Sequence, residues 1–299
     1  MKQTFLLILA TALIFVTQEP VSKMLSGQVN PLSLTCLRFF IGGLILLPFA
    51  LRELKVKRQK LQKRDIIRLV ILGIICICIS KTLQQVSVFK ANSAAVAAIV
   101  FSVNSVFTMI LAVFFLKEKL TWKKLLALVI CIAGVLLSTD FSSGENTVGI
   151  LLAVVAALFF SIYTVMGKKM MARCSSLVQT SFAFLFGSIA LFFILCVSGI
   201  NILAGINITN IWILLYLGII GTGIGYYLYF AAVERSVLSA SFVFFIKPAL
   251  APFAAWLLLG DMPGIWVFAT LLLVLLGSYL SLPGKKKKAS QEASLKNSY

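Results

Sequence analysis

Residues 93–118 read SAAVAAIVFSVNSVFTMILAVFFLKE, and residues 236–261 read SVLSASFVFFIKPALAPFAAWLLLGD. Each stretch starts with serine, stays almost wholly apolar and ends at an acidic residue. Each is long enough to cross the hydrocarbon core of a bilayer, which takes about 20 apolar residues in a helix. The two stretches align without a gap, with Ser93 on Ser236 and Glu118 on Asp261, and the ungapped alignment extends over 84–138 and 227–281. The repeat predicts a membrane protein with two related halves.

Similar apolar runs fill the rest of the chain. Hydrophobic residues make up 61% of the 299 positions and charged residues 12%, whereas soluble domains have about 25% charged residues. We therefore predict an all-α polytopic membrane protein with ten transmembrane helices. The ten runs lie at roughly 4–24, 31–51, 66–88, 92–116, 121–139, 147–167, 177–198, 209–231, 237–259 and 263–282.

The distribution of basic residues predicts the orientation. With the N-terminus in the cytoplasm, 22 of the 27 Lys and Arg residues fall on the cytoplasmic side and only Lys23 and Lys90 fall outside. This bias indicates cytoplasmic N- and C-termini in a bacterial-type inner membrane. Five helices is an odd number, so the second half is inverted relative to the first. The predicted units are a first repeat at 1–140, a second repeat at 145–283 and a basic, disordered cytoplasmic tail at 284–299.

Several classes of function are disfavoured by composition. The chain contains no histidine, its six cysteines lie in or beside apolar runs without zinc or disulfide spacing, and it has no nucleotide-binding loop. We expect no cofactor, no metal site and no catalytic residues. The net charge of +18 comes from blocks between apolar runs, so we expect contact with membrane lipids rather than with nucleic acid.

Charged side chains inside apolar helices are the most informative positions, because each costs about 2.5–3.5 kcal/mol at the centre of a helix. Glu19, Lys81 and Lys247 are predicted to line a cavity and bind the cargo. Arg38 lies two turns inside its helix and can extend its charge towards the interface, so we interpret it as structural.

Two pairings are open for Glu19. Glu19 and Lys81 each lie fifteen residues into an outward-running helix, roughly 22 Å deep, so they could meet, either around the two charged ends of a zwitterion or as a permanent salt bridge. Alternatively, Glu19 pairs with Lys23, one turn further along the same helix.

Helix-breaking residues lie beside these charges. Pro20 follows Glu19, and Pro248 and Pro252 follow Lys247; a proline inside a helix removes a hydrogen bond and clashes with the preceding turn. We predict hinges or broken backbone at all three. Gly221 and Gly225 are predicted to allow close helix contact or sliding.

Neutral polar residues complete the predicted site. Buried amide and phenol groups can hydrogen-bond either to a cargo or across a helix interface. The predicted cargo-binding set adds Gln84, Gln85, Asn104, Tyr163 and Tyr227 to the three charged residues.

Short motifs resemble those of the drug/metabolite transporter superfamily, in its ten-helix EamA-like branch. They are Leu37-Arg38-Phe39, the turn at 116–121, Lys247-Pro248-Ala249, Gly260-Asp261, and the glycines Gly134 and Gly277. The chain departs from the family in having Asn104-Ser105 where the fourth helix carries a proline. The resemblance implies a central cavity lined by helices 1, 3, 4, 6, 8 and 9, and export of amino acids, metabolites or drugs.

We therefore predict a secondary transporter, an exporter of a small metabolite such as an amino acid or organic anion, working by alternating access and not an enzyme. Glu19 could couple transport to protons. One alternative is an efflux permease for drugs or cationic compounds. Another is a membrane-embedded lipid-modifying enzyme, against which the single intramembrane acid and the lack of histidine argue. The sequence leaves the cargo, the coupling ion and the oligomeric state open.

Overall fold

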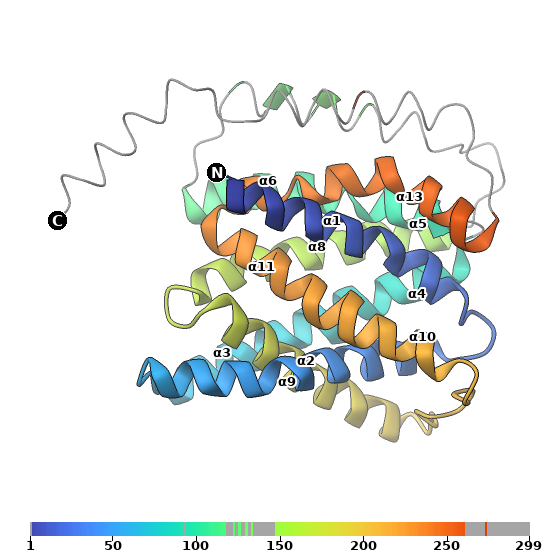
Figure 1. Ribbon diagram of the computed structural model, residues 1–299, viewed down its shortest axis with the longest axis horizontal. Coiled ribbons are helices and arrows are strands. Elements are labelled where there is room, and N and C mark those ends of the chain that lie inside the picture. The colour runs from blue at the N-terminus through green and yellow to red at the C-terminus, as the bar shows by residue number, and fades with distance from the viewer. Residues whose placement is uncertain are drawn as a thin grey trace.

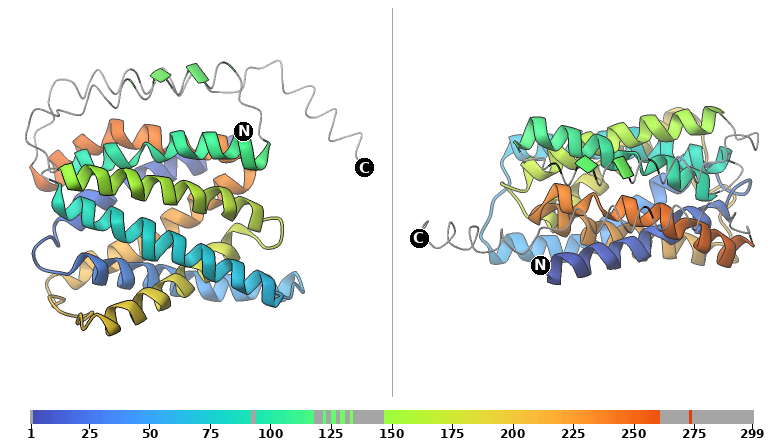
Figure 2. Two further views of the ribbon diagram at one scale, coloured as in Figure 1. Left: turned by 180° about the vertical axis from the view of Figure 1, so that it is seen from behind. Right: turned by 90° about the horizontal axis from the view of Figure 1, so that it is seen from above.

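The computed structural model describes residues 2–91, 94–117 and 147–260, with residues 122, 125, 126, 129, 130, 133 and 273. Every regular element in these residues is helical, and six helices are long and apolar enough to cross a membrane. They run side by side along one direction (Figures 1 and 2). Their bounds are α1 Lys2–Lys23, α2 Pro31–Val56, a composite helix Lys63–Lys90, α8 Thr147–Met170, α9 Ser176–Val197 and a composite helix Ile211–Arg235.

Both composite helices contain a π-helical segment. The first consists of α3 (Lys63–Gly73), η1 (Ile74–Lys81) and α4 (Thr82–Lys90). The second consists of α10 (Ile211–Tyr216), η2 (Leu217–Ile224) and α11 (Gly225–Arg235). π-Helical turns are rare and occur frequently at functional sites, so the sites beside η1 and η2 are of particular interest.

Two further helices are interrupted. The predicted run 92–116 forms α5 (Ala94–Phe101) and α6 (Asn104–Leu116), and the run 237–259 forms α12 (Val237–Ala240) and α13 (Val243–Leu259). Serine hydroxyls bond back to the preceding turn at both interruptions: Ser102 Oγ donates to Ala98 O at 2.8 Å and Ser241 Oγ to Val237 O at 3.0 Å. Such back-bonding competes with the helical ladder and bends helices.

The interruption in the ninth predicted span is not at the prolines. α13 is helical through both Pro248 and Pro252, and α1 is helical through Pro20. The expectation of broken backbone at these prolines is therefore wrong, because the break before α13 lies at Ser241 and Phe242, where the serine competes with the ladder. Any hinge motion at the prolines stays a prediction.

Helix boundaries recur in the register of the sequence repeat. The offset that places Ser93 on Ser236 also places both ends of η1 on those of η2, and the end of α6 on the end of α13. α6 and α13 are each followed by a left-handed residue, Lys117 with φ 55° and Gly260 with φ 79°. A slightly larger offset, which places Lys23 on Lys168, superimposes the starts of α1 and α2 on those of α8 and α9. This shared register supports the predicted repeat.

The number of membrane spans is confirmed only in part. Most residues of the fifth and tenth predicted helices, at 121–139 and 263–282, lie outside the described residues. The six long helices, together with the interrupted α5–α6 and α12–α13 segments, account for the other predicted runs. The count of ten therefore stays a prediction.

The two ends of the bundle differ in charge. α1 begins at one end, called here the basic end, where α2, α8 and α11 finish (Figure 1). α1 finishes at the opposite end, where α2, α8 and α10 begin. Basic residues in or beside the helix termini at the basic end include Lys57, Arg58, Lys60, Lys63, Arg64, Lys168, Lys169, Arg173 and Arg235. The described part of the chain is thus a multi-pass helical membrane bundle with one strongly basic end.

Candidate functional site

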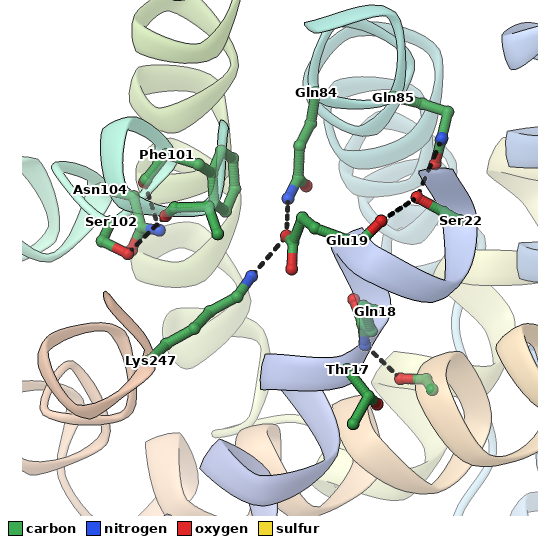
Figure 3. Close-up of polar contacts among 12 residues, drawn as sticks. Thr17, Gln18, Glu19, Ser22, Gln84, Gln85, Phe101, Ser102, Asn104 and Lys247 are labelled. Carbon is green, nitrogen blue, oxygen red and sulfur yellow. Dashed lines mark hydrogen bonds and ion pairs between the residues drawn. The ribbon is translucent and has the colours of Figure 1, made fainter. Parts of the chain in front are cut away.

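Three of the predicted charged residues meet in the middle of the bundle. Glu19 on α1, Lys81 at the end of η1 and Lys247 on α13 are 2%, 0% and 1% exposed. Glu19 Oε1 accepts hydrogen bonds from Lys247 Nζ at 2.5 Å and from Gln84 Nε2 at 2.8 Å. Gln84 Oε1 in turn accepts from Lys81 Nζ at 2.8 Å. These four side chains, called here the Glu19 network, connect three helices that are far apart in sequence. Figure 3 shows three of them, Glu19, Gln84 and Lys247.

The ion pair in this network is one that sequence reasoning did not consider. Glu19 pairs with Lys247 rather than with Lys81 or Lys23. Lys81 reaches Glu19 only through Gln84, and Lys23 donates to the carbonyl of Val88 at 3.0 Å at the end of α4. A cation is favourable at the carbonyl end of a helix. Depth placed Glu19 and Lys81 at one level, but the rotation of each helix about its axis decides which side chains touch.

Aromatic rings surround the Lys81 ammonium. Its Nζ lies 3.9 Å from the ring centroid of Phe160, 4.4 Å from that of Phe101 and 5.1 Å from that of Tyr226. An ammonium over a desolvated ring face gains about 2 kcal/mol. The rings and Gln84 together hold Lys81, so its head group faces aromatic side chains.

A narrow polar crevice lies beside the network on the side of the opposite end. It has about 160 Å³ of space between its atoms and is too narrow for a water-sized sphere. Its lining residues are Gln18, Glu19, Ser22, Arg38, Gln84, Gln85 and Val88. Glu19 and Gln84 contribute to both the crevice and the network, whereas Lys81 is not among the lining residues.

Arg38 is the functional candidate that sequence reasoning missed. It was interpreted as a structural residue reaching towards the interface, but it is 3% exposed and lines the crevice with Glu19. Its guanidinium lies 4.9 Å from the ring centroid of Phe39. Within the described residues, neither Arg38 Nε nor Glu19 Oε2 has a hydrogen-bond partner. Buried polar atoms are normally paired, so these two atoms mark where a ligand could bind. The Leu37-Arg38-Phe39 motif was the available signal.

Two of the predicted polar residues occupy other positions in the core. Asn104 is fully buried at the break between α5 and α6, where its Nδ2 donates to Phe101 O at 2.9 Å. Tyr163 OH accepts from Gln179 Nε2 at 3.0 Å, which joins α8 to α9. Gln85, by contrast, lines the crevice, and its Nε2 donates to Ser22 Oγ at 3.3 Å. The structure therefore brings Gln84 and Gln85 to the crevice but gives Tyr163 an interhelical bond.

Among the tyrosines of α11, the structure does not bring Tyr227 to the network. Tyr226 and Tyr229 are buried in the centre, whereas Tyr227 is half-buried and lines a polar pocket at the basic end with Glu53 and Glu234. Neighbouring residues of a helix point about 100° apart, so the choice among the three depends on the rotation of α11. Tyr226, not Tyr227, is the tyrosine near Lys81.

Gly221 and Gly225 let α1 approach the second composite helix. A Cβ on Gly225 would lie 2.9 Å from Ile14 Cγ2 and 3.0 Å from Phe15 Cε1. Gly221 lies in η2, and its carbonyl accepts a hydrogen bond from Gln18 Nε2 at 2.5 Å. These contacts support close approach; sliding during transport stays a prediction.

An aromatic cluster covers the network on the side of the basic end. Phe15 precedes Glu19 by one turn of α1, and Phe244 precedes Lys247 by nearly one turn of α13. Phe15 lies 4.7 Å from Tyr226 and 6.0 Å from Phe244, centroid to centroid. Phe160 lies 5.6 Å from Phe244. Packed rings thus separate the Glu19 network from the basic end, while the polar crevice lies on the other side.

Acidic and thiol groups do not form a metal site in the described part of the chain, where no group of three or more Cys, Asp or Glu residues could hold an ion. The charged and amide groups of the Glu19 network and the crevice are one carboxylate, two ammonium groups, a guanidinium and the amides of Gln18, Gln84 and Gln85. This set suits an organic molecule with charged ends.

The comparisons with known proteins agree with this architecture. The model of the EamA-like transporter family matches residues 2–139 and 147–282. A protein of Clostridium kluyveri named an uncharacterized transporter is 36% identical, over 96% of this chain and 95% of that protein. A Chlamydia muridarum protein named an S-adenosylmethionine/S-adenosylhomocysteine transporter is 27% identical, over 90% of this chain and 88% of its own. A solved crystal structure shares the fold, with a TM-score of 0.76 at 18% identity, over 94% of this chain and 96% of that one. The chain is a multi-pass membrane protein of the EamA-like transporter family, within the drug/metabolite transporter superfamily.

Proposed function

We propose that the protein is a secondary exporter of small metabolites that carry an amino-acid end group, and that the Glu19 crevice, which is closed in the described conformation and widens to admit cargo, is its cargo site. The observation that carries the proposal is the pair of unpartnered buried atoms, Glu19 Oε2 and Arg38 Nε, on side chains that line one crevice of the described chain. An α-amino acid group has an ammonium that complements a carboxylate and a carboxylate that complements a guanidinium. Arg38 replaces Lys81 as the proposed partner of the cargo carboxylate, because Lys81 is held by rings and Gln84.

Electrostatic balance favours a cargo with a carboxylate. If all are ionised, Glu19, Lys81, Lys247 and Arg38 leave the membrane interior with a net charge of about +2. Buried charges that lack compensation are costly. An amino-acid end group has no net charge and leaves this sum unchanged, but its carboxylate would pair with Arg38 and its ammonium with Glu19, whereas a purely cationic drug would leave Arg38 without a partner. An organic anion without an ammonium would fit Arg38 alone and would leave Glu19 Oε2 without a partner.

One relative supports the same chemistry. S-adenosylmethionine and S-adenosylhomocysteine, which appear in the name of the Chlamydia muridarum relative, both carry an amino-acid end group. Glu19 and Arg38 in the crevice would bind the amino-acid end group irrespective of the rest of the molecule. Cargo of this type also has an aromatic base, for which the rings around the network offer apolar contacts.

Alternating access is proposed to arise from two inverted five-helix repeats at 1–140 and 145–283. The first repeat supplies Glu19 and Gln84, and the second supplies Lys247 and most of the aromatic cluster. Inverted repeats let the two halves exchange conformations around a central site. In the described conformation the rings close the site towards the basic end, which we place in the cytoplasm because of the positive-inside rule.

A ligand screen tests the cargo class. Purified protein should show a higher unfolding temperature with amino acids or S-adenosylmethionine than with nucleosides or with organic cations that lack an amino-acid group, because a ligand that binds only the folded state stabilises it. Glu19→Gln should abolish the shift. Stabilisation by cationic drugs alone, or by amino acids equally in Glu19→Gln, would contradict the proposal.

Proton coupling through Glu19 is a separate proposal. It rests on the one buried acid of the network, whose Oε2 lacks a partner in the described chain. Cargo flux in proteoliposomes should then respond to an imposed pH gradient. A pH-sensitive dye in the lumen should report acidification of the lumen during this flux. Flux that is unchanged by the gradient would exclude protons as the coupling ion.

A further inference from the structure

We propose that Lys247 is an internal substitute for the ammonium group of the cargo. When the site is empty, Lys247 neutralises Glu19 so that the empty transporter can change conformation; when cargo binds, its ammonium takes over this role. This inference rests on the proposed function and adds a mechanism for the return step, in which Lys247 and not a counter-transported proton neutralises Glu19; it is the alternative to the proton coupling proposed above.

The geometry places Lys247 where it can play this part. Its Nζ lies 2.5 Å from Glu19 Oε1, and both side chains are 2% exposed. The second oxygen, Oε2, has no partner within the described residues and belongs to a crevice-lining side chain. A cargo ammonium at Oε2 would put two cations on one carboxylate. Their mutual repulsion weakens the hold of Lys247 on Oε1.

The pair also joins the two halves of the molecule. Glu19 lies on α1 and Lys247 on α13, and these two helices pack along each other. The repeat does not duplicate the pair, since Thr164 and Asn104 stand at the corresponding positions. When a cargo ammonium takes the place of Lys247, the ion pair that connects the two halves is therefore lost, while the charge of Glu19 remains neutralised.

An exposed ion pair of the same chemistry provides a matched control. Lys57 Nζ lies 2.5 Å from Glu53 Oε1, the same separation, but the two side chains are 56% and 22% exposed. Water can compensate Glu53 when Lys57 is removed, because surface ion pairs contribute little. Water cannot compensate Glu19 in the same way, so only the buried pair requires a permanent cation.

The experiment compares net flux with exchange in proteoliposomes, using a radiolabelled amino-acid mixture and, in a second arm, radiolabelled S-adenosylmethionine. Net flux requires the empty transporter to return, whereas exchange of cargo for cargo does not. The variants are Lys247→Met and Lys247→Gln, the latter keeping a hydrogen-bond donor for Glu19. Lys247→Arg restores the charge, and Lys57→Met is the control.

We expect Lys247→Met and Lys247→Gln to lose at least about tenfold in net flux, because removal of one partner strands a buried charge. Exchange should stay close to the wild-type rate, because the cargo ammonium neutralises Glu19 in that cycle. Lys247→Arg should recover net flux, and Lys57→Met should leave both unchanged. If net flux and exchange fall together in Lys247→Gln, or if neither falls, the inference is overturned while the proposed function stands. A wild-type protein that moves neither probe would overturn both.

Discussion

At the scale of single residues, the central contact is the buried ion pair between Glu19 on α1 and Lys247 on α13, with Lys81 reaching Glu19 through Gln84. Glu19, Lys81 and Lys247 stand out in this sequence because each interrupts an apolar run. Their convergence follows from similar depth. Contact between Glu19 and Lys247 depends on how α1 and α13 are rotated about their axes. Sequence-based helix boundaries are uncertain by a few residues, so they do not reveal which side chains face each other. Arg38 was underestimated for the same reason.

Arg38 gives the first prediction. Arg38→Lys keeps the charge but removes the planar guanidinium that suits a carboxylate. Loss of a charged hydrogen bond is worth about 1.5–3 kcal/mol, so the half-saturating cargo concentration should rise about tenfold to a hundredfold. The exposed Arg64→Lys is the control. A normal concentration dependence in Arg38→Lys would show that Arg38 does not touch the cargo.

Cysteine reactivity gives a prediction for the connection between α8 and α9, compared with the end of α9. Cys174 lies in the connection between α8 and α9, is 3% exposed, and burial raises the pKa of its thiol from 9.0 to about 12. The thiolate is the reactive form, so its fraction stays very small up to about pH 10 in folded protein. Cys196 is exposed. Mass spectrometry after maleimide treatment at neutral pH should find label on Cys196 and not on Cys174; rapid modification of Cys174 would contradict its burial.

At the scale of elements, the spans were predictable and their irregularities were not. Apolar length and loop charge define α1, α2, α8 and α9 to within a few residues. The sequence signals for prolines suggested breaks at Pro20 and Pro248, whereas the helices break beside Ser102 and Ser241. Neither η1 nor η2 has a sequence signal of its own. The hydrogen bonds of a π-helix, from residue i to i+5, depend on how the surrounding helices pack against the segment.

Helix crossing gives an element-scale prediction. Gly73 on α3 and Gly187 on α9 touch so closely that a Cβ on either would collide with the backbone of the other. Gly187→Ala should cost about 1–3 kcal/mol of stability through overpacking. A Cβ on Gly149 would lie 3.6 Å from its nearest neighbour, so Gly149→Ala should be neutral or stabilise by up to about 1 kcal/mol. Thermal unfolding of the two variants in detergent tests this difference. Equal unfolding temperatures for Gly187→Ala and Gly149→Ala would contradict the close contact between Gly73 and Gly187.

At the scale of the whole molecule, the repeat was visible in the sequence as the ungapped alignment of 84–138 with 227–281. The structure adds a shared register of η1 with η2 and of the ends of α6 and α13. The cargo site is nevertheless asymmetric, since one half provides the acid and the other provides Lys247. Such asymmetry cannot be read from a repeat, because a repeat predicts the scaffold and not the side chains grafted onto it.

Orientation gives a prediction at this scale. With the basic end in the cytoplasm, Asn201→Cys in the connection between α9 and α10 should react with a membrane-impermeant thiol reagent in intact cells. Arg58→Cys, at the basic end, should react only after the cells are opened. Both would be made in a background whose native cysteines are replaced. The reversed pattern would show that the protein has the opposite orientation.

The central claim is that a buried acid, held by Lys247 and Gln84, binds the cargo. Initial rates of amino-acid uptake into proteoliposomes, measured for Glu19→Gln beside Glu53→Gln, test it most directly. The two variants make the same chemical change in an ion pair of the same length, one buried and one partly exposed. The account predicts uptake near background for Glu19→Gln and wild-type uptake for Glu53→Gln. Wild-type uptake by folded Glu19→Gln protein would contradict it.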